Sequence, residues 1–186
     1  SYTLQGFCRV CDRNVDFLVD RQCGAENSGG VWIPNWRERM VCSCCGLNNR
    51  QRAIAFTARA IVGKFRDRRP DVYLMEQVTP IYQWMVESVP QAVCTGSEYL
   101  GENLSGGKTV KGIRHEDVEC LSFPAESFDL IVSNDVLEHV VNPADALKEA
   151  SRVLRPKGVL LMTVPFFLGE SKSVRRAGVR NGKLEH

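Results

Sequence analysis

The sequence predicts an α/β protein with a mostly parallel sheet and helices on both faces, preceded by a small cysteine-rich module. Two observations carry this prediction. From residue 71 onward, short apolar segments alternate with amphipathic ones, which is the order that strand–helix–strand units require. Before that point, two C-x-x-C pairs lie in a segment that is rich in Gly, Arg and Trp and has no long periodic pattern.

A helix is predicted between these two regions, because apolar side chains recur at three- and four-residue steps over 47–69 with arginines on the other side. Pro70 ends it, since the residue before a proline disfavours the helical conformation. The expected organisation is a module at 1–46, a linker helix at 47–70 and an α/β domain at 71–186.

The elements of the α/β domain can be placed from apolar runs and turn residues. In chain order they are a strand at 71–76, a helix at 80–88, a strand at 92–99, a Gly-rich loop at 101–111, a weaker strand at 112–118, a strand at 127–135, a helix at 143–154 and a strand at 159–166. Pro156-Lys157-Gly158 is expected to break the chain before the last strand. The alternation is typical of a Rossmann-like sheet.

Composition places the chain among ordinary globular proteins, with 44% hydrophobic and 25% charged residues. No apolar run approaches the roughly 18 residues of a membrane span, and no signal peptide is visible, so we expect no membrane partner and a cytoplasmic location. Residues 1–70 carry twelve Lys/Arg against six Asp/Glu, whereas 71–186 carry twelve against sixteen. This asymmetry is a weak indication of an anionic partner.

The two cysteine pairs predict a structural zinc site formed by Cys8, Cys11, Cys42 and Cys45. Each C-x-x-C directs two thiolates at one ion, and two pairs complete a closed tetrahedral shell with no open position for catalysis. Gly46 allows a tight turn after the second pair. The alternative is a set of buried free thiols. Of the remaining cysteines, Cys44 or Cys23 could substitute as a ligand, and Cys94 and Cys120 are expected in the core.

The segment from His115 to Phe166 carries the motifs L-S-F-P-A-E-S-F-D, L-E-H and R-V-L-R-P-K-G in that order. It resembles class I S-adenosylmethionine (SAM)-dependent methyltransferases of the type 11-like kind. The chain also resembles a bacterial subgroup of these methyltransferases that has an N-terminal zinc ribbon and a degenerate glycine loop. The resemblance lies in the two C-x-x-C pairs (hereafter the first and second knuckles), the linker helix, and the segments LMEQVTPIYQW and SEYLG. Members often accompany polysaccharide pathways. In such domains further strands normally follow the last one here, so the C-terminal part is expected to be truncated.

Ligands of open α/β sheets bind beyond the carboxyl ends of the strands, and the resemblance assigns cofactor contacts there. It implies that Glu98 accepts the ribose hydroxyls and that Asp117 and Val118 meet the adenine. The full expected set is Glu76, Thr79, Glu98, Tyr99, Asp117, Val118, Asn134 and Asp135. The alternative for each acid is a solvated strand-end carboxylate.

The turn after the first strand of the domain departs from the family pattern. The resembled fold has a G-x-G loop there, because glycine lets the backbone approach the cofactor. This chain has Met75-Glu76-Gln77-Val78-Thr79-Pro80 and no glycine. Either the loop follows another path, with Glu76 or Thr79 at the methionine moiety, or the site does not bind cofactor.

Asp135, Glu138 and His139 lie at spacings that share one helical face. Asp135 and His139 are the expected catalytic residues, with His139 as a general base. A similar acid-x-x-Glu-His set binds Mg²⁺ in ubiquinone-pathway O-methyltransferases. L-E-H is also common in methyltransferases without metal, so capping and solvation of a short helix is preferred over a Mg²⁺ site.

The resemblance implies methyl transfer to an oxygen or nitrogen nucleophile of a saccharide or another small molecule. One alternative is a catalytically inactive, methyltransferase-like binding module in a glycan-biosynthesis assembly. Another is an RNA methyltransferase that uses the basic zinc module, motivated by the arginines at 50, 52, 59, 66, 68 and 69. A solvated helix face explains these arginines equally well, so nucleic acid is not favoured. The sequence does not indicate an oligomeric state.

Overall fold

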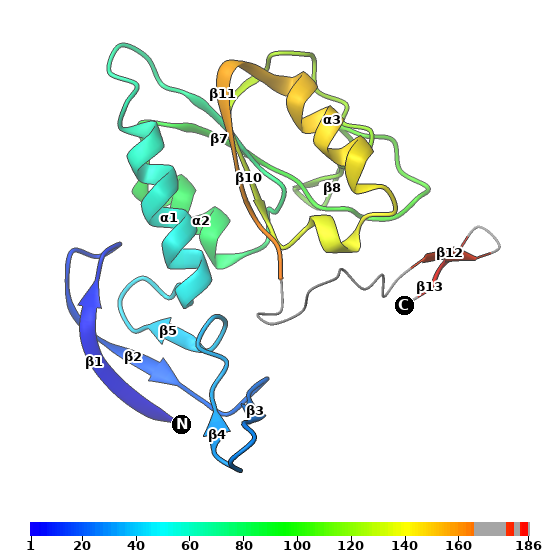
Figure 1. Cartoon of the computed structure of the whole chain (residues 1–186). Coiled ribbons are helices and arrows are strands. Elements are labelled where there is room, and N and C mark those ends of the chain that lie inside the picture. The colour runs from blue at the N-terminus through cyan, green and yellow to red at the C-terminus, as the bar shows by residue number, and fades with distance from the viewer. Residues whose placement is uncertain (166–177, 181–182, 186) are drawn as a thin grey trace. The chain divides into compact units, whose positions relative to one another are not determined.

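The computed structural model describes residues 1–165, 178–180 and 183–185 (Figure 1). The chain forms two compact units, one of Ser1–Pro70 with Val78–Cys94 and the other of Asp71–Gln77 with Thr95–His186. In this grouping, the expected linker helix at 47–70 and the segment 78–94 both belong with the cysteine-rich part. Among the described residues, no helix is both long and apolar enough to cross a membrane.

The first unit contains a small antiparallel sheet in the order β1-β2-β5. Its strands are β1 (Tyr2–Cys8), β2 (Arg13–Val19) and β5 (Met40–Cys42), and a separate hairpin pairs β3 (Ala25–Glu26) with β4 (Trp32–Ile33). Phe17 and Val19 of β2 are buried and alternate with exposed residues, as expected for a sheet with one covered face.

Helix α1 (Asn49–Val62) begins at a capping box in which the Asn48 side chain accepts from the Gln51 backbone N–H and Gln51 reciprocates. Its apolar face is buried through Ile54, Ala58 and Val62, as predicted. The helix ends at Gly63, before the predicted residue 69. The prediction that its arginines lie opposite the apolar face is wrong for Arg52, which is only 8% exposed.

Helix α2 (Pro80–Ser88) coincides with its predicted range. Pro80 occupies the first turn, where its missing N–H costs nothing. Thr79 is the N-cap, and its hydroxyl accepts from the Tyr82 N–H at 3.4 Å. Ile81, Trp84 and Met85 are its buried residues.

The second unit is built on a sheet in the order β11-β10-β6-β7. The strands are β6 (Asp71–Leu74), β7 (Val93–Gly96), β10 (Phe128–Asn134) and β11 (Leu154–Thr163). β10 pairs in parallel with both β6 and β11, which confirms the parallel sheet. All seven residues of β10 are buried, as is typical of a central parallel strand.

Helix α3 (Pro143–Val153) covers one face of this sheet (Figure 1). Ala150 and Val153 share a buried cluster with Tyr73 of β6 and Ile131 of β10, and Met75, Leu121 and Phe128 complete it. Asn142 caps the helix by accepting from Ala144 N–H at 3.2 Å. This helix is the one whose start, end and buried face follow most directly from its local sequence.

β11 begins earlier than predicted, and Pro156-Lys157-Gly158 lies inside it rather than breaking the chain. The pairing with β10 shifts register between Phe128 and Leu130, and Lys157 has φ 69°. Pro156-Lys157-Gly158 therefore form a bulge-like irregularity within β11. Arg155, in the same segment, places its Nη1 2.8 Å from Oδ2 of both Asp71 and Asp129 and so joins the starts of β6, β10 and β11. Residue 166 of the predicted strand lies outside the described residues.

The predicted strand 112–118 is wrong in detail. Residues 109–114 form a hairpin of β8 (Thr109–Val110) and β9 (Ile113–Arg114). Its two turn residues, Lys111 and Gly112, have φ of 51° and 84°, the left-handed values that a tight two-residue hairpin turn needs. Beyond it, only single bridges join Glu98 to His115 and Asp117 to Cys120. At the C-terminus, β12 (Gly178–Arg180) pairs antiparallel with β13 (Lys183–Glu185).

Candidate functional site

The first candidate site is the four-cysteine cluster of the first unit. The Sγ atoms of Cys8, Cys11, Cys42 and Cys45 all lie within 4.8 Å of one another. The Cys11–Cys42 separation is 3.8 Å, about the edge of a tetrahedron of sulfurs around an ion at 2.3 Å. Among the described residues this is the one group gathered as metal ligands. It could hold a metal ion.

Local backbone geometry builds the second knuckle. Gly46 has φ 71°, and its N–H donates to the Cys42 carbonyl at 3.0 Å, which closes the turn. The N–H groups of Cys44 and Cys45 lie 3.4 and 3.5 Å from Cys42 Sγ. Burial raises the pKa of the Cys42 thiol, but these N–H groups outweigh it and leave that pKa below its ordinary value. The turn therefore favours the thiolate of Cys42, the form that binds metal, whereas burial raises the pKa of the Cys45 thiol in the same knuckle to about 11.

The other cysteines are not among the four gathered ligands, although the Cys44 thiol interacts with that of Cys11. Cys44 is exposed beside Arg13, whose guanidinium hydrogen-bonds its sulfur, and Cys23 is exposed as well. Cys94 is half-buried, and burial raises the pKa of its thiol to about 11. Cys120 is exposed, which corrects its expected place in the core: it lies in a turn closed by its N–H to the Asp117 carbonyl.

Arginines of α1 hold both knuckles. Arg59 donates to the carbonyls of Val10 and Arg9 at 2.9 and 3.1 Å, within the first knuckle. Arg52 donates to the carbonyls of Leu47 and Met40 at 2.9 and 2.7 Å, beside the second. Arg9, Val10 and Leu47 lie outside the strands and Met40 begins β5, so the two side chains join the helix to both knuckles and have a structural use.

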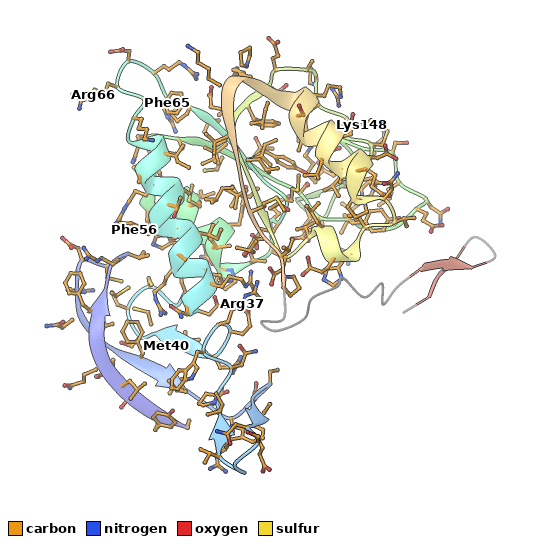
Figure 2. The ribbon with its side chains drawn as sticks, in the orientation of Figure 1. Arg37, Met40, Phe56, Phe65, Arg66 and Lys148 are labelled. Carbon is orange, nitrogen blue, oxygen red and sulfur yellow. The ribbon has the colours of Figure 1, made fainter. Side chains whose placement is uncertain are left out.

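The remaining basic residues of this region divide into paired and solvated ones. Arg50 forms two hydrogen bonds with the Glu38 carboxylate, at 2.6 and 2.9 Å. Arg69 donates to the Ala92 carbonyl at 2.8 Å. Arg66 is exposed beyond the end of α1 (Figure 2). Most of the arginines that suggested a basic surface are therefore engaged within the first unit.

The second candidate site lies at the carboxyl ends of the strands of the second unit. Glu98 follows β7 and is half-buried. Its backbone pairs with the segment after β9, donating to Arg114 O at 2.9 Å and accepting from Glu116 N at 3.2 Å. Its side-chain Oε1 accepts the Gln77 backbone N–H at 2.7 Å. Glu98 is thus fixed through both its backbone and its carboxylate at the sheet edge where ligands of such folds bind.

The glycine-free turn after β6 is well ordered by hydrogen bonds. Met75 N–H continues the ladder to Val132 O at 2.9 Å, and Glu76 is only 7% exposed. Thr79 uses its hydroxyl to cap α2, so the structure gives this expected cofactor contact a local structural role. Gln77 was not predicted; its side chain bonds to residues far along the chain, and no local pattern marks it.

Tyr99, Asp117 and Val118 occupy different environments. Tyr99 is 56% exposed, and its ring centroid lies 5.5 Å from that of buried His115. Asp117 Oδ1 accepts the Glu119 N–H at 2.9 Å and so shapes a turn. Val118 packs against the core cluster under α3. Tyr99 therefore presents the largest exposed surface of the three.

Sequence reasoning missed two buried polar residues of this region. His115 accepts the Leu100 N–H on Nδ1 at 3.0 Å, which ties the loop after Tyr99 to the following segment. Glu116 is 1% exposed and binds Arg114 at 2.7–2.8 Å and both the N–H and the hydroxyl of Ser122. The His115 partner lies 15 residues away, and those of Glu116 lie two and six residues away in an irregular segment where no periodic pattern marks such contacts.

β10 ends at Asn134, one residue before the predicted end of the strand, and Asp135 follows it directly. The Thr163 hydroxyl lies 2.9 Å from an oxygen of each, and Asp135 N–H donates to Thr163 O at 3.1 Å. Asp135 has φ 57°, a left-handed conformation that Asp adopts more readily than most residues. Strained backbone of this kind is frequent at ligand sites.

Glu138 and His139 follow in a short 3₁₀ helix, η1 (Leu137–His139), and His139 is exposed. The predicted single face with Asp135 assumed an α-helical turn. Asp135 instead lies outside η1 with a left-handed backbone. Of the residues described, the structure gathers the four cysteines and not these three side chains as metal ligands.

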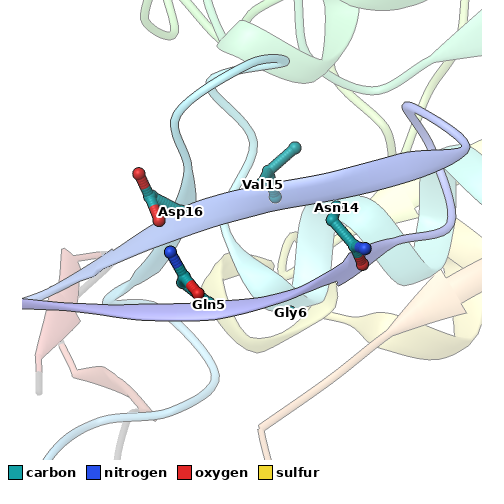
Figure 3. A pocket seen from close by; sticks show the side chains of 5 residues that line it. All are labelled: Gln5, Gly6, Asn14, Val15 and Asp16. Atoms are coloured by element: carbon teal, nitrogen blue, oxygen red, sulfur yellow. The ribbon is translucent and has the colours of Figure 1, made fainter.

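An open hollow lies over the β1–β2 hairpin of the first unit (Figure 3). Its volume is about 460 Å³, and Gln5, Gly6, Asn14, Val15 and Asp16 line it. Gln5 and Asp16 are cross-strand partners. The hollow is polar and shallow, and sequence reasoning did not anticipate it.

Comparison with known proteins shows which part of the chain is similar to a methyltransferase family. Residues 81–162 match the family described as "Methyltransferase domain". A Mycolicibacterium smegmatis protein named "Probable S-adenosylmethionine-dependent methyltransferase" is 42% identical over 53 residues, which are 28% of this chain and 21% of that protein. These similarities support a class I methyltransferase, for which the family implies SAM.

Two further similarities are more limited. An uncharacterized 37.1 kDa protein of a Streptomyces fradiae transposon is 47% identical over 49 residues, 26% of this chain and 14% of that protein. The chain thus spans about a fifth or less of the curated relatives it matches. A solved complex of the Haloferax volcanii Trm112 methyltransferase activator with a protein described as a methyltransferase matches at 15% identity and a TM-score of 0.38, over 62% of this chain and 56% of the other. That likeness is too low to support a function.

Proposed function

We propose that this chain transfers a methyl group from SAM to an oxygen or nitrogen nucleophile of a small-molecule acceptor, with saccharides as the first class to examine. The observation that carries the proposal is the fixed Glu98 carboxylate at the end of β7, in a chain whose residues 81–162 match a methyltransferase family. A carboxylate there can accept two hydroxyl hydrogens of one ribose.

The residues present fit the cofactor. Glu98 offers the diol acceptor, and exposed Tyr99 beside it offers an aromatic surface for the adenine. Glu76, Asp117 and the Asn134–Asp135 pair supply further polar groups at the same strand ends. When bound, SAM supplies the transferable methyl on its sulfonium. The chain's part is to hold this ligand and the acceptor in line, which alone accounts for much of such a rate enhancement.

His139 is the proposed general base. It is exposed on η1, directly after the Asn134–Asp135 strand end, where an acceptor can reach it. Neutral imidazole would take the proton that the acceptor's oxygen or nitrogen loses as its bond to the methyl carbon forms. Asp135 would orient the acceptor through its carboxylate, whose position Thr163 restrains.

Zinc is the proposed ion of the four-cysteine cluster. The donor set is all sulfur, the 3.8 Å separation of Cys11 Sγ and Cys42 Sγ agrees with a tetrahedron around zinc, and two thiols come from each knuckle. All four positions of the shell are taken by protein, so the ion would stabilise the module and leave catalysis to the second unit.

A catalytically inactive binding module remains the second candidate, because the turn after β6 has no glycine. No observation favours the RNA methyltransferase alternative: the engaged arginines of α1 account for its main support.

Calorimetric titration with S-adenosylhomocysteine tests the proposal. The unaltered protein and a Glu102→Ala control, which removes an exposed acid nearby, should bind one equivalent, and Glu98→Ala should bind at least about tenfold more weakly. If the folded, unaltered protein gives no heat and no thermal shift, the inactive module becomes the preferred function.

A further inference from the structure

Gln77 stands in the turn where the family's glycine loop is expected, and its side chain makes two long-range hydrogen bonds. Its Nε2 donates to Gly112 O at 2.9 Å, and its Oε1 accepts from Arg114 N–H at 2.8 Å. Both partners belong to the β8–β9 hairpin segment, 35 and 37 residues further along the chain. The side chain is therefore held toward the hairpin.

These two bonds have the pattern of a parallel β-ladder. In such a ladder, the N–H of one residue donates to residue i−1 of the neighbouring strand, and the C=O of the same residue accepts from residue i+1. Glu98 does this with its backbone, donating to Arg114 O and accepting from Glu116 N–H around His115. The Gln77 carboxamide repeats the pattern two residues earlier, around Ile113. It thereby takes the place of the N–H and C=O of one strand residue and extends the pairing begun by Glu98.

The same residue fixes the carboxylate of Glu98. While its side chain bonds to the hairpin, the backbone N–H of Gln77 donates to Glu98 Oε1, 2.7 Å away. A glycine could not supply the side-chain anchor, although it would leave the same N–H. In this turn, the side-chain hydrogen bonds of Gln77 therefore stand where the family pattern has glycine, whose conformational freedom lets the backbone approach the cofactor.

We infer that Gln77 is a positioning residue that aligns the Glu98 carboxylate for a vicinal diol, and hence that it helps this chain select ribose over deoxyribose in its nucleoside ligand. The inference rests on the proposed function, because Glu98 is taken as the ribose acceptor. Gln77 acts through Glu98 and needs no contact with the ligand.

The test compares the affinities of two probes, S-adenosylhomocysteine and its 2′,3′-dideoxy analogue. The unaltered protein should prefer the first by about tenfold or more, the effect of about 1.4 kcal/mol. In Gln77→Ala, affinity for S-adenosylhomocysteine should fall about tenfold while that for the analogue stays nearly unchanged. The ratio of the affinities for the two probes would then approach one, and we expect the same ratio in Glu98→Gln.

Two further variants keep the test decisive. Gln77→Glu retains the acceptor for Arg114 N–H but replaces the donor to Gly112 O, so an intermediate ratio is expected even if Gln77→Ala folds poorly. Gln83→Ala is the matched control, since the Gln83 side chain donates to Glu87 at 3.0 Å on the exposed face of α2. Its ratio of affinities should equal that of the unaltered protein.

The outcomes separate the inference from the function on which it rests. If Gln77→Ala and Gln77→Glu both keep the full ratio, or weaken both probes equally, Gln77 is not a positioning residue although the cofactor site stands. If the unaltered protein binds neither probe, the proposed function itself fails and the inference fails with it.

Discussion

The guanidinium of Arg59 binds the carbonyl oxygen of Val10 across 49 residues of sequence, at 2.9 Å. Arg59 lies in α1, and Val10 lies between the two cysteines of the first knuckle. A helix side chain therefore holds the loop that presents Cys8 and Cys11. This contact makes the cysteine-rich part and α1 a single structural unit, in agreement with their grouping in the fold.

Arg59→Ala should destabilise the first unit by about 2 kcal/mol, because charge-assisted bonds to two loop carbonyls are lost. Arg66→Ala, which removes an exposed arginine from the segment after the same helix, should change stability by less than about 0.5 kcal/mol. Urea unfolding of the metal-loaded proteins measures both. Equal effects for the two variants would show that the Arg59 contacts contribute little.

Single Cys→Ser changes at residues 8, 11, 42 and 45 should each abolish stoichiometric binding of about one metal ion per chain, because each removes one of four ligands. Cys44→Ser should retain the ion, since Cys44 lies outside the cluster. Elemental analysis of the purified proteins gives the metal content, and a chelator should lower the thermal midpoint of the unaltered protein. Loss of metal in Cys44→Ser would instead assign a ligand role to that residue.

Gly158→Ala should destabilise the second unit by roughly 1–3 kcal/mol. A Cβ at this position would lie 2.8 Å from the Arg155 carbonyl oxygen and 2.9 Å from Leu154 Cδ2, and the backbone atom cannot move aside easily. Gly29→Ala is the control, because its Cβ would meet only Asn27 Oδ1, at an ordinary 3.5 Å. A thermal midpoint for Gly158→Ala that matches the control would contradict the close approach.

Glu149 should contribute stability that depends on pH. Arg152 donates two hydrogen bonds to its carboxylate and Leu121 N–H a third, which holds the pKa of Glu149 below its ordinary value of about 4.5. A lowered folded-state pKa stabilises the protein above the unfolded-state pKa, and this contribution is lost as pH falls through the folded value. Glu149→Gln should therefore be less stable than the unaltered protein at pH 7, with the difference shrinking below about pH 4. A pH-independent difference in chemical unfolding would argue against this assignment.

Elements with a local signal could be predicted from the sequence. β10 is a continuous apolar run with turn residues on both sides, and α3 has a cap, a proline in its first turn and a periodic face. The four cysteines carry their own spacing, which is why the cluster was expected before any geometry was known. In each case the determining residues lie within a few positions of one another.

The β8–β9 hairpin shows where a signal existed but was not used. In Val110-Lys111-Gly112-Ile113, the two turn residues lie between β-branched residues, and glycine is the turn residue that adopts a positive φ most readily. The expected strand at 112–118 ignored it. The helix end at Gly63 is similar, since glycine is a frequent helix terminator.

Other features had no local signal. The ties of Arg52 and Gln77 join segments that are far apart in sequence, and a single sequence does not state which distant backbone groups need a partner. Arginine on an amphipathic helix usually faces water, so the burial of Arg52 follows from its hydrogen bonds to Met40 and Leu47 and not from the helix sequence itself. The long-range hydrogen bonds that order both candidate sites therefore could not be predicted from the sequence.

The segment between β2 and β5 is enclosed by the pairing of Phe17 with Cys42 and contains only the short β3–β4 hairpin. For a flexible loop whose ends are already joined, each doubling of length costs only about 0.6 kcal/mol. This part of the first unit should accordingly accept inserted residues at its outer turn, around Ser28 and Gly29, without loss of the cysteine cluster. It offers a natural position for an internal epitope or fluorophore, and a place where related sequences can vary in length.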